Sequence, residues 1–312
     1  MRLSDLPKLF ERRDLWSIAV YRYERLEDLF ACQPGLLAHF HGETGFRVSK
    51  DYEAVVADPF LFPYAESLYL FYEVKTDHHH GTIHAKSMAK DGSWQYHGLV
   101  LEEPFHLSYP QVFALGTRIF MLPEAAQSGT VRLYESVEFP NRWHHCATLI
   151  DSPLRDPTLL AIEDDGFIIV ATTPDYRLKF YHSNTIYGPF ADKNLVITHD
   201  PRFARGAGGI LNVNGQLLRP VQDCSISYGK SIGFQLITEF SKSTWLEHHS
   251  GLNLFFPLAE WRSRGSHHIS CANFGSSVFV AIDGRGPDQL LNSCLLGLIR
   301  AAEKLPVFHT KS

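Results

Sequence analysis

The sequence predicts an all-β protein that folds as a single five-bladed β-propeller. One unit recurs five times: a polar residue opens a short apolar strand, a turn follows, a second apolar strand runs back, and a polar residue closes it. Successive units begin about fifty residues apart, a period typical of propeller blades. Turn-forming residues such as Asn214-Gly215 stand between the two strands. The five units open at Asp58, Ser108, Asp156, Arg205 and His267.

The first expected elements precede these units. Residues 1–14 are expected to form a short helix or arm. Residues 16–23 alternate between apolar and polar side chains, which predicts a strand. Propellers often use an early strand to complete the last blade, so we expect this strand to close the ring.

Each unit is expected to be an antiparallel hairpin whose last residue returns beside its first. The expected facing pairs are Asp58 with Glu73, Ser108 with Glu124, Asp156 with Thr173, Arg205 and Gly206 with Asp223, and His267 with Asp283. If these hairpins are the inner strands, carboxylates, arginines and histidines ring one mouth of a central funnel.

Outer strands are expected after the first three units. The expected third strands are 82–87, 130–134 and 178–182, and the expected fourth strands are 94–97 and 143–146. Residues 288–304 carry leucines at helical spacing and are expected to pack outside the barrel. No linker or low-complexity segment interrupts the chain, so residues 1–312 are expected to form one domain.

Composition excludes several classes of partner. The formal net charge is −5 and no basic run is dense, which argues against a nucleic-acid partner. The longest apolar runs are too short for a transmembrane segment, and the charged N-terminus lacks the apolar stretch of a signal peptide. Five scattered cysteines without CxxC spacing indicate neither zinc nor a disulfide framework. We therefore expect free thiols in a cytoplasmic protein. No cofactor and no metal are expected, although the imidazoles of His106, His267 and His268 could bind hydroxyls, move protons or hold a metal near the axis.

Two Asp-Pro sequences supply the first candidate catalytic residues. Asp58 opens the first unit and could act as a base or nucleophile, and Asp156 opens the third. Two carboxylates that face one cavity are what glycosidic-bond hydrolysis requires, one protonated and one ionised. An Asp before Pro at the start of a strand is also common for structural reasons alone. Glu124 is the first choice for the acid and Asp223 the second.

Other polar and aromatic side chains at the same mouth are candidate substrate-binding residues. They are His106, Ser108, Tyr109, Arg205, Arg219, Gln222, Tyr228, His267 and His268. The glycine-rich segment that begins at Arg205 has two interpretations. It could cradle an anionic group, or it could let the inner strands crowd around the axis.

Several segments resemble one known family. The strings ADPFLF, HLSYPQVF, VRLYESVEFPNRW, DPTLL and RPVQDCSISYG, together with His267-His268, are similar to the N-terminal propeller-like domain of plant glucosamine inositolphosphorylceramide transferases and its bacterial relatives. The likeness runs from about Trp16 to about Gly284. In the plant proteins a separate glycosyltransferase domain follows, and no DxD-bearing nucleotide-sugar fold follows here. The resemblance therefore implies no transferase activity, although a glycosyltransferase could be a partner.

A more distant resemblance is to the five-bladed glycoside hydrolases of families 43, 32 and 68. It implies a nucleophile or base at Asp58 and a transition-state-stabilising carboxylate at Asp156, within Arg155-Asp156-Pro157. The acid Glu motif of those families has no match, so Glu124 or Asp223 would have to substitute. We expect a carbohydrate-active protein that acts on a glycan or glycoconjugate in the funnel. The alternative is a non-catalytic module that binds a glycan or sugar-lipid and assists a glycosyltransferase.

Overall fold

The computed structural model describes residues 14–32, 34–41, 55–75, 79–163, 165–254 and 259–287. The expected arm before residue 14 and the expected helix at 288–304 lie outside these residues. Within them, no helix is long and apolar enough to cross a membrane. The cysteines that the structure describes, Cys32, Cys146, Cys224 and Cys271, are free.

The described chain is built from β-strands in four sheets. The largest has eight strands in the order β20-β21-β1-β3-β4-β5-β6, with β2 paired beside β1. Its strands are β1 (Asp14–Tyr23), β2 (Gly35–His41), β3 (Val55–Tyr64), β4 (Ser67–Lys75), β5 (Thr82–Ala89), β6 (Trp94–Leu101), β20 (Ile269–Phe274) and β21 (Ser277–Pro287).

The other three sheets each follow the chain in order. The second holds β7 (Ser108–Leu115), β8 (Arg118–Glu124), β9 (Val131–Glu138) and β10 (Arg142–Ile150). The third holds β11 (Arg155–Ile162), β12 (Gly166–Thr172), β13 (Leu178–Ser183) and β14 (Ala191–Thr198). The fourth holds β15 (Arg205–Gly206), β16 (Leu211–Val213), β17 (Gln216–Asp223), β18 (Ser231–Phe240) and β19 (Trp245–His249). Three short 3-10 helices connect strands: η2 (Leu26–Phe30), η3 (Ala126–Ser128) and η4 (Glu260–Arg262).

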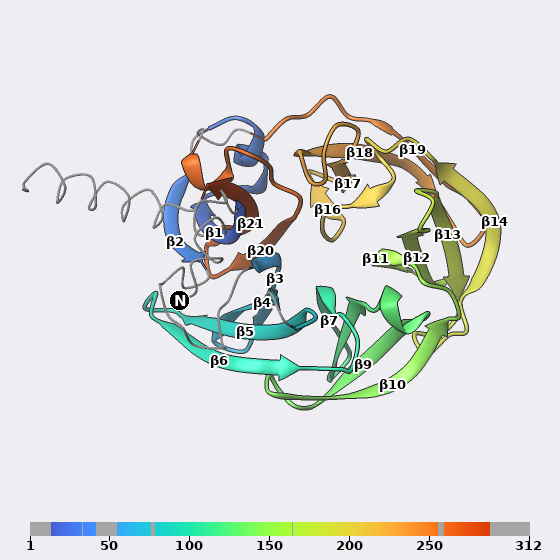
Figure 1. Cartoon of the computed structure of the whole chain (residues 1–312), viewed down its shortest axis with the longest axis horizontal. Coiled ribbons are helices and arrows are strands. Elements are labelled where there is room, and N and C mark those ends of the chain that lie inside the picture. The colour runs from blue at the N-terminus through green and yellow to red at the C-terminus, as the bar shows by residue number, and fades with distance from the viewer. Residues whose placement is uncertain are drawn as a thin grey trace, which may run out of the picture.

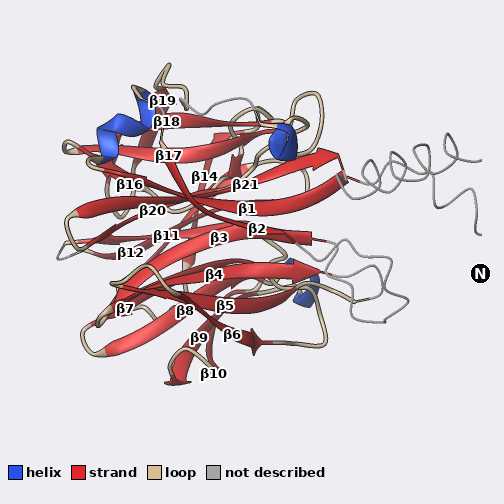
Figure 2. Ribbon diagram, turned by 90° about the vertical axis from the view of Figure 1, so that its left-hand side faces the viewer, coloured by secondary structure: helices blue, strands red, loops and turns tan. Residues whose placement is uncertain are grey.

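We call each of the three smaller sheets a strand group, and likewise each part of the largest sheet on either side of the β1–β3 pair. The strand groups are arranged around a common centre (Figure 1). β3, β7, β11, β16 and β20 lie nearest the middle of that view, and the later strands of each group lie farther out. Seen from the side, the strand groups lie one above another, and most of their strands run across the view (Figure 2). The all-β class predicted from the sequence is confirmed, as are the expected third and fourth strands.

The hairpin registers agree with the sequence prediction to within one residue. Ser108 pairs with Glu124 as expected. Glu73 pairs with Ala57, the neighbour of Asp58, and Arg205 pairs with Gln222, the neighbour of Asp223. The prediction succeeded because a short turn fixes the register of its own hairpin.

Three of the hairpins contain the same irregularity near their open end. The first strand gains one residue between Ala57 and Phe60, between Ser108 and Gln111, and between Arg155 and Thr158. An extra residue of this kind is a β-bulge, which bends the strand and redirects a side chain. The bulges therefore lie at equivalent places in β3, β7 and β11.

β1 joins the two ends of the described chain. It pairs antiparallel with β21 over its whole length, from Asp14 opposite Pro287 to Tyr23 opposite Val278. Its link to β3 is one parallel pair, Trp16 with Val55. Both faces of β1 are buried, because Ile18 and Val20 enter one apolar core and Ala19 and Tyr21 enter the next.

Five apolar cores lie between neighbouring strand groups. They join β16–β18 to β1, β20 and β21; these three strands to β3 and β4; β3–β6 to β7–β9; β7–β10 to β11–β13; and β11–β14 to β17–β19. Each core includes a fully buried large side chain, for example Phe71, Phe120 or Phe180. Burying one such side chain stabilises the fold by about 1.5–3 kcal/mol.

Candidate functional site

A cavity of about 320 Å³ lies where the inner hairpins begin and end. This volume is at the lower end of the range that small-molecule sites occupy. Its wall is formed by Trp16, Val55, Ala57, Asp58, Glu73, Lys75, His106, Ser108, Glu124, Arg155, Arg205, Tyr228 and His267. The residues come from all four sheets or the loops beside them. Six of the predicted opening and closing residues meet here, namely Asp58, Glu73, Ser108, Glu124, Arg205 and His267, whereas Asp156, Thr173, Asp223 and Asp283 do not line the cavity.

The three bulges set the backbone at this end of the fold. Asp58, Tyr109 and Asp156 have φ values of 53°, 50° and 49°, and a proline follows each. The backbone of a residue other than glycine is strained in this left-handed region, and the conformation persists only where the surrounding structure holds it. Here the amides of the three residues donate hydrogen bonds to carboxylates of the preceding strand group: Asp58 to Asp283, Tyr109 to Asp58, and Asp156 to Glu124.

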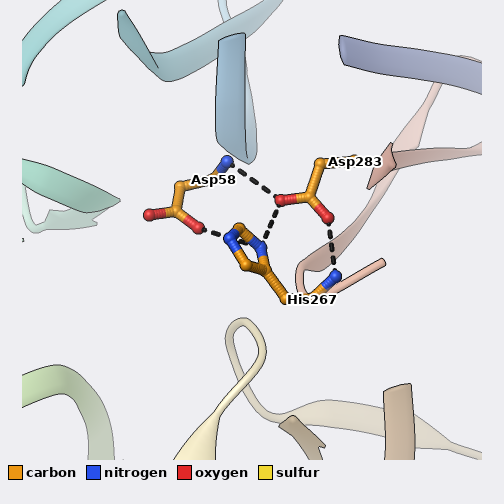
Figure 3. A group of neighbouring side chains, drawn as sticks. All are labelled: Asp58, His267 and Asp283. Carbon is orange, nitrogen blue, oxygen red and sulfur yellow. Dashed lines mark hydrogen bonds and ion pairs between the residues drawn. The ribbon is translucent and has the colours of Figure 1, made fainter. Parts of the chain in front are cut away.

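Asp58 and Asp283 hold His267 between them (Figure 3). His267 Nδ1 lies 2.5 Å from Asp283 Oδ2 and 3.6 Å from Asp58 Oδ1. The His267 amide also donates to Asp283 Oδ1 over 2.8 Å. The indole of Trp16 stacks on the imidazole with ring centres 4.0 Å apart. The imidazole is therefore fixed in both position and tilt.

These contacts decide the charge of Asp58. Burial alone would raise its pKa, but the imidazoles of His268 and His267 outweigh burial and hold the pKa well below the usual range. Burial favours the neutral form of His267, yet the Asp283 and Asp58 carboxylates outweigh it and raise the imidazole pKa. Asp58 is thus a buried carboxylate that stays ionised.

Glu124 has the opposite electrostatic setting. Burial and the charge of Asp156 raise its pKa well above the ordinary value, and Arg205 offsets only part of this effect. The reason is that Arg205 is already paired with Asp156, with Nε and Nη2 donating to the two carboxylate oxygens over 2.7 and 2.9 Å. Glu124 Oε2 lies 3.9 Å from Arg205 Nη2. Glu124 is thus a buried carboxyl group that holds its proton to a higher pH than an ordinary glutamate does.

Glu73 is a second acid of this kind. Burial and the charge of Asp58 raise its pKa well above the ordinary value. Its neighbour His106 accepts a hydrogen bond at Nδ1 from the Gly81 amide, so a neutral ring carries its proton on Nε2, which lies 3.5 Å from Glu73 Oε1. Burial and the charge of Lys75 lower the pKa of His106. The wall beside Asp58 therefore contains a neutral carboxyl group and a neutral imidazole.

Several predicted residues lie just behind the cavity wall. Asp156 supports Arg205, and Gln222 donates to the Gly206 carbonyl over 2.7 Å. The Tyr109 hydroxyl bonds to Thr158 and to both backbone groups of Gly208, and His268 Nδ1 lies 3.4 Å from Asp58 Oδ1. These side chains hold the wall together and do not line the space.

Two predicted residues lie elsewhere. Arg219 is fully buried, with Nε donating to Glu247 Oε2 over 2.8 Å and Nη2 to the Phe203 carbonyl over 2.8 Å. Its assignment to substrate binding was wrong, because β19 supplies a carboxylate that the sequence did not pair with it. Asp223 accepts hydrogen bonds from the amide and hydroxyl of Ser225 and is not part of the cavity wall. Its candidacy as the acid fails for that reason.

The glycine-rich segment supports the crowding interpretation. A Cβ at Gly208 would come within 1.9 Å of the Ile269 carbonyl oxygen, and a Cβ at Gly206 within 2.9 Å of the Tyr109 hydroxyl. These glycines let β15 and its continuation approach the neighbouring strands. Arg205, at the start of the segment, is already occupied by Asp156.

Sequence reasoning did not select some residues of the wall. Glu73 and Asp283 were expected to face site residues but were given no role, although they close their hairpins as Glu124 does. Trp16, Lys75 and Arg155 were not assigned to the site. Treating the opening and closing residues of every hairpin alike would have found Glu73 and Asp283.

One group of described residues could hold a metal ion. A nitrogen of His267 and oxygens of Asp58 and Asp283 all lie within 4.8 Å of one another. A divalent cation there would replace the proton that His267 holds between the two carboxylates. The sequence expected no metal, and this geometry leaves that expectation without support.

Comparison with known proteins gives one family and one fold. The sequence profile "Glucosamine inositolphosphorylceramide transferase 1, N-terminal" matches residues 46–285. The chain is 32% identical over 243 residues to glucosamine inositolphosphorylceramide transferase 1 of Oryza sativa subsp. japonica, covering 73% of this chain and 32% of that protein. It is 30% identical over 269 residues to the protein of that name in Arabidopsis thaliana, covering 81% and 35%. The chain thus spans about a third of the length of these relatives.

Similar solved structures are glycoside hydrolases. An α-L-arabinofuranosidase of Podospora anserina in complex with cellotriose superposes with a TM-score of 0.54 at 11% identity, covering 76% of this chain and 93% of that one. The catalytic domain of a family 62 α-L-arabinofuranosidase of Coprinopsis cinerea gives 0.53 at 11% identity, covering 77% and 94%. Identities this low show a common propeller-like fold and leave the chemistry of the cavity to be argued from its own residues.

Proposed function

This chain belongs to the family of the N-terminal region of glucosamine inositolphosphorylceramide transferase 1, and from that premise we propose that it is a carbohydrate-active, glycoside-hydrolase-like propeller. A glycan or glycoconjugate is its ligand, and the cavity at the inner hairpins is its site. The glycoside hydrolases with a similar fold support a sugar ligand, as does the family itself.

The complete fold in this proposal is a closed five-bladed propeller, with residues 1–312 in one domain. The eight-stranded sheet meets at a single parallel pair, Trp16 with Val55, and division there gives two units. With the other three sheets, that makes five units. The five apolar cores, each between neighbouring units, support the same count.

The observation that carries the proposed chemistry is the opposite protonation of two carboxyl groups in one wall. The pKa of Asp58 is lowered, and that of Glu124 is raised. Glycosidic-bond cleavage needs an ionised carboxylate and a protonated one on the two sides of the scissile bond.

The proposed mechanism follows from these charges. Glu124 donates its proton to the glycosidic oxygen of the leaving group. Asp58 acts as the base that activates water or as the nucleophile that attacks the anomeric carbon. Asp156, paired with Arg205, stabilises positive charge that develops on the sugar ring in the transition state. Glu73 supports Asp58 by presenting a neutral carboxyl group in place of a second charge.

Substitution of the two carboxyl groups tests the proposal. In a screen of aryl glycosides, Asp58→Asn should lower kcat by a factor of at least about 10² while the protein stays folded. Glu124→Gln should reduce turnover most for substrates with poor leaving groups, because those need the proton. Asp175→Asn, at an exposed turn where Asp175 pairs with Arg177, is the matched control. If the wild-type protein binds sugars but turns over no glycoside, the catalytic assignment is overturned.

A specific observation also favours the alternative, a non-catalytic glycan-binding module. Both oxygens of Asp156 are engaged by Arg205, and Asp58 Oδ2 accepts the Tyr109 amide. Carboxylates held this way can be purely structural. A module of this kind would present a glycan or sugar-lipid to a glycosyltransferase partner. Normal glycan binding by Asp58→Asn, together with absent turnover in wild type, is the result expected of it.

A further inference from the structure

Two cations in the cavity wall form no ion pair with another residue that the structure describes. Lys75, at the end of β4, and Arg155, at the start of β11, both line the cavity. Among the described residues no carboxylate forms an ion pair with either. The guanidinium of Arg155 lies over the Tyr176 ring at 6.0 Å, and Lys75 is exposed.

The other cations of the same wall are neutralised inside the protein. Arg205 makes a bidentate pair with Asp156, and His267 lies 2.5 Å from Asp283. A bidentate or fully buried pair leaves little capacity to attract a further anion. Lys75 and Arg155 therefore differ in kind from the cations that build the wall.

The neighbouring acids do not supply the missing charge. Glu73 stands two residues before Lys75, and the charge of Lys75 lowers its pKa, but burial and Asp58 outweigh this effect and raise the pKa well above the ordinary value. Burial and the charge of Asp156 raise the pKa of Glu124 in the same way. Burial thus favours the protonated form of each, which is a hydrogen-bond donor and not a counter-ion. The cavity thus combines two exposed or half-buried positive charges with protonated carboxyl groups, and each of these groups interacts favourably with an anionic oxygen.

We infer that the sugar bound in this cavity carries an anionic group, a carboxylate or a phosphate ester, that interacts with Lys75 and Arg155. This inference rests on the proposed glycan ligand and adds the chemical class of that glycan. A carboxylate and a phosphate share the recognition by lysine and arginine, so the two sources are separated by experiment.

The test is a binding titration of the full chain with four probes. They are methyl glucoside, methyl glucuronide, glucose 1-phosphate and inorganic phosphate. At low ionic strength, about 0.02 M, one of the two acidic sugars should bind about tenfold or more tightly than methyl glucoside. Raising the ionic strength to about 0.2 M should weaken the binding of the acidic sugar and leave the binding of the neutral sugar unchanged. The tighter of the two acidic sugars identifies the source of the negative charge.

Charge-removing variants show whether the preference arises from these residues. Lys75→Gln and Arg155→Gln should each lower the acid-to-neutral preference several-fold, and the double variant should reduce it to about one. Lys90→Gln removes the same charge from an exposed ion pair with Glu66 at the far turn, and it should leave the preference unchanged. Thermal melting of each variant confirms that the fold persists.

The failures are distinguishable. Equal binding of neutral and acidic sugars, or a preference that survives the double variant, overturns the anionic inference and leaves glycan binding intact. If no sugar binds, the proposed function fails and the inference fails with it. If inorganic phosphate binds and no sugar does, the proposed function and the inference also both fail, because each requires a bound sugar.

Discussion

Asp58 and Glu124 are buried carboxyl groups of one cavity, and their neighbours push their charges in opposite directions. Burial raises the pKa of both. Two imidazoles reverse the effect at Asp58, whereas the Asp156 carboxylate reinforces it at Glu124. Arg205 only partly offsets the rise at Glu124, because two of its N–H groups donate to the oxygens of Asp156.

The raised pKa of Glu124 predicts a pH-dependent stability. A carboxyl group whose pKa is higher in the folded state binds its proton more tightly there, so its contribution is complete below the unfolded value and is lost as pH rises. Glu124→Gln cannot titrate. The free energy of unfolding of Glu124→Gln relative to wild type should therefore increase between pH 5 and pH 8, by up to about 1.4 kcal/mol per pH unit.

Urea unfolding at a series of pH values measures this difference. Histidines whose pKa is lowered, such as His106, titrate in the same range but are common to both proteins and cancel in the comparison. Glu138→Gln makes the same substitution at an exposed side chain and serves as the control. A Glu124→Gln curve parallel to that of wild type would contradict the protonated state assigned to Glu124.

At the scale of elements, close approach between strands explains the glycine at 208. Gly208 has φ of 133°, both its backbone groups bond to the Tyr109 hydroxyl, and a Cβ there would meet the Ile269 carbonyl oxygen at 1.9 Å. Three strand groups thus meet at one residue. Gly208→Ala should cost at least about 2 kcal/mol of unfolding free energy, from overlap and strain together.

Chemical denaturation checks the cost. Gly35→Ala in β2 is the control, since a Cβ at Gly35 meets no atom within 4 Å. It should change the stability by a few tenths of a kcal/mol at most, or increase it slightly. Equal effects of the two substitutions would mean that the strands can separate at Gly208 without loss.

The elements also show what the sequence could and could not predict. Hairpins were predictable because each turn and its two strands are consecutive in the chain. Arg219 was misassigned because its partner Glu247 lies on another strand, 28 residues later. The Tyr109 hydroxyl reaches Gly208 across 99 residues, and no local pattern encodes such a contact. A comparison of the three prolines after Asp58, Tyr109 and Asp156 would have revealed that these positions are equivalent.

At the scale of the whole molecule, every strand group shares an apolar core with both of its neighbours. No group can unfold without exposing two cores, which favours one cooperative transition. Urea unfolding followed by tryptophan fluorescence and by far-UV circular dichroism should therefore give coincident curves. Four of the five tryptophans lie in three of the four described sheets (Trp16, Trp94, Trp143 and Trp245), and the fifth, Trp261, lies in η4. Two separated transitions would contradict a single cooperative unit.

The pairing of β1 with β21 has a consequence for the protein as it leaves the ribosome. Synthesis proceeds at about 5–20 residues per second, so β1 emerges on the order of tens of seconds before the strand that pairs with it from Asp14 to Tyr23. Asp58 is made about equally long before Asp283, which accepts a hydrogen bond from the Asp58 amide and holds His267 beside it. β2 can pair with one edge of β1 early, but the edge that β21 takes stays unpaired until nearly all described residues exist. The cavity is likewise incomplete until His267 and Asp283 have been synthesised.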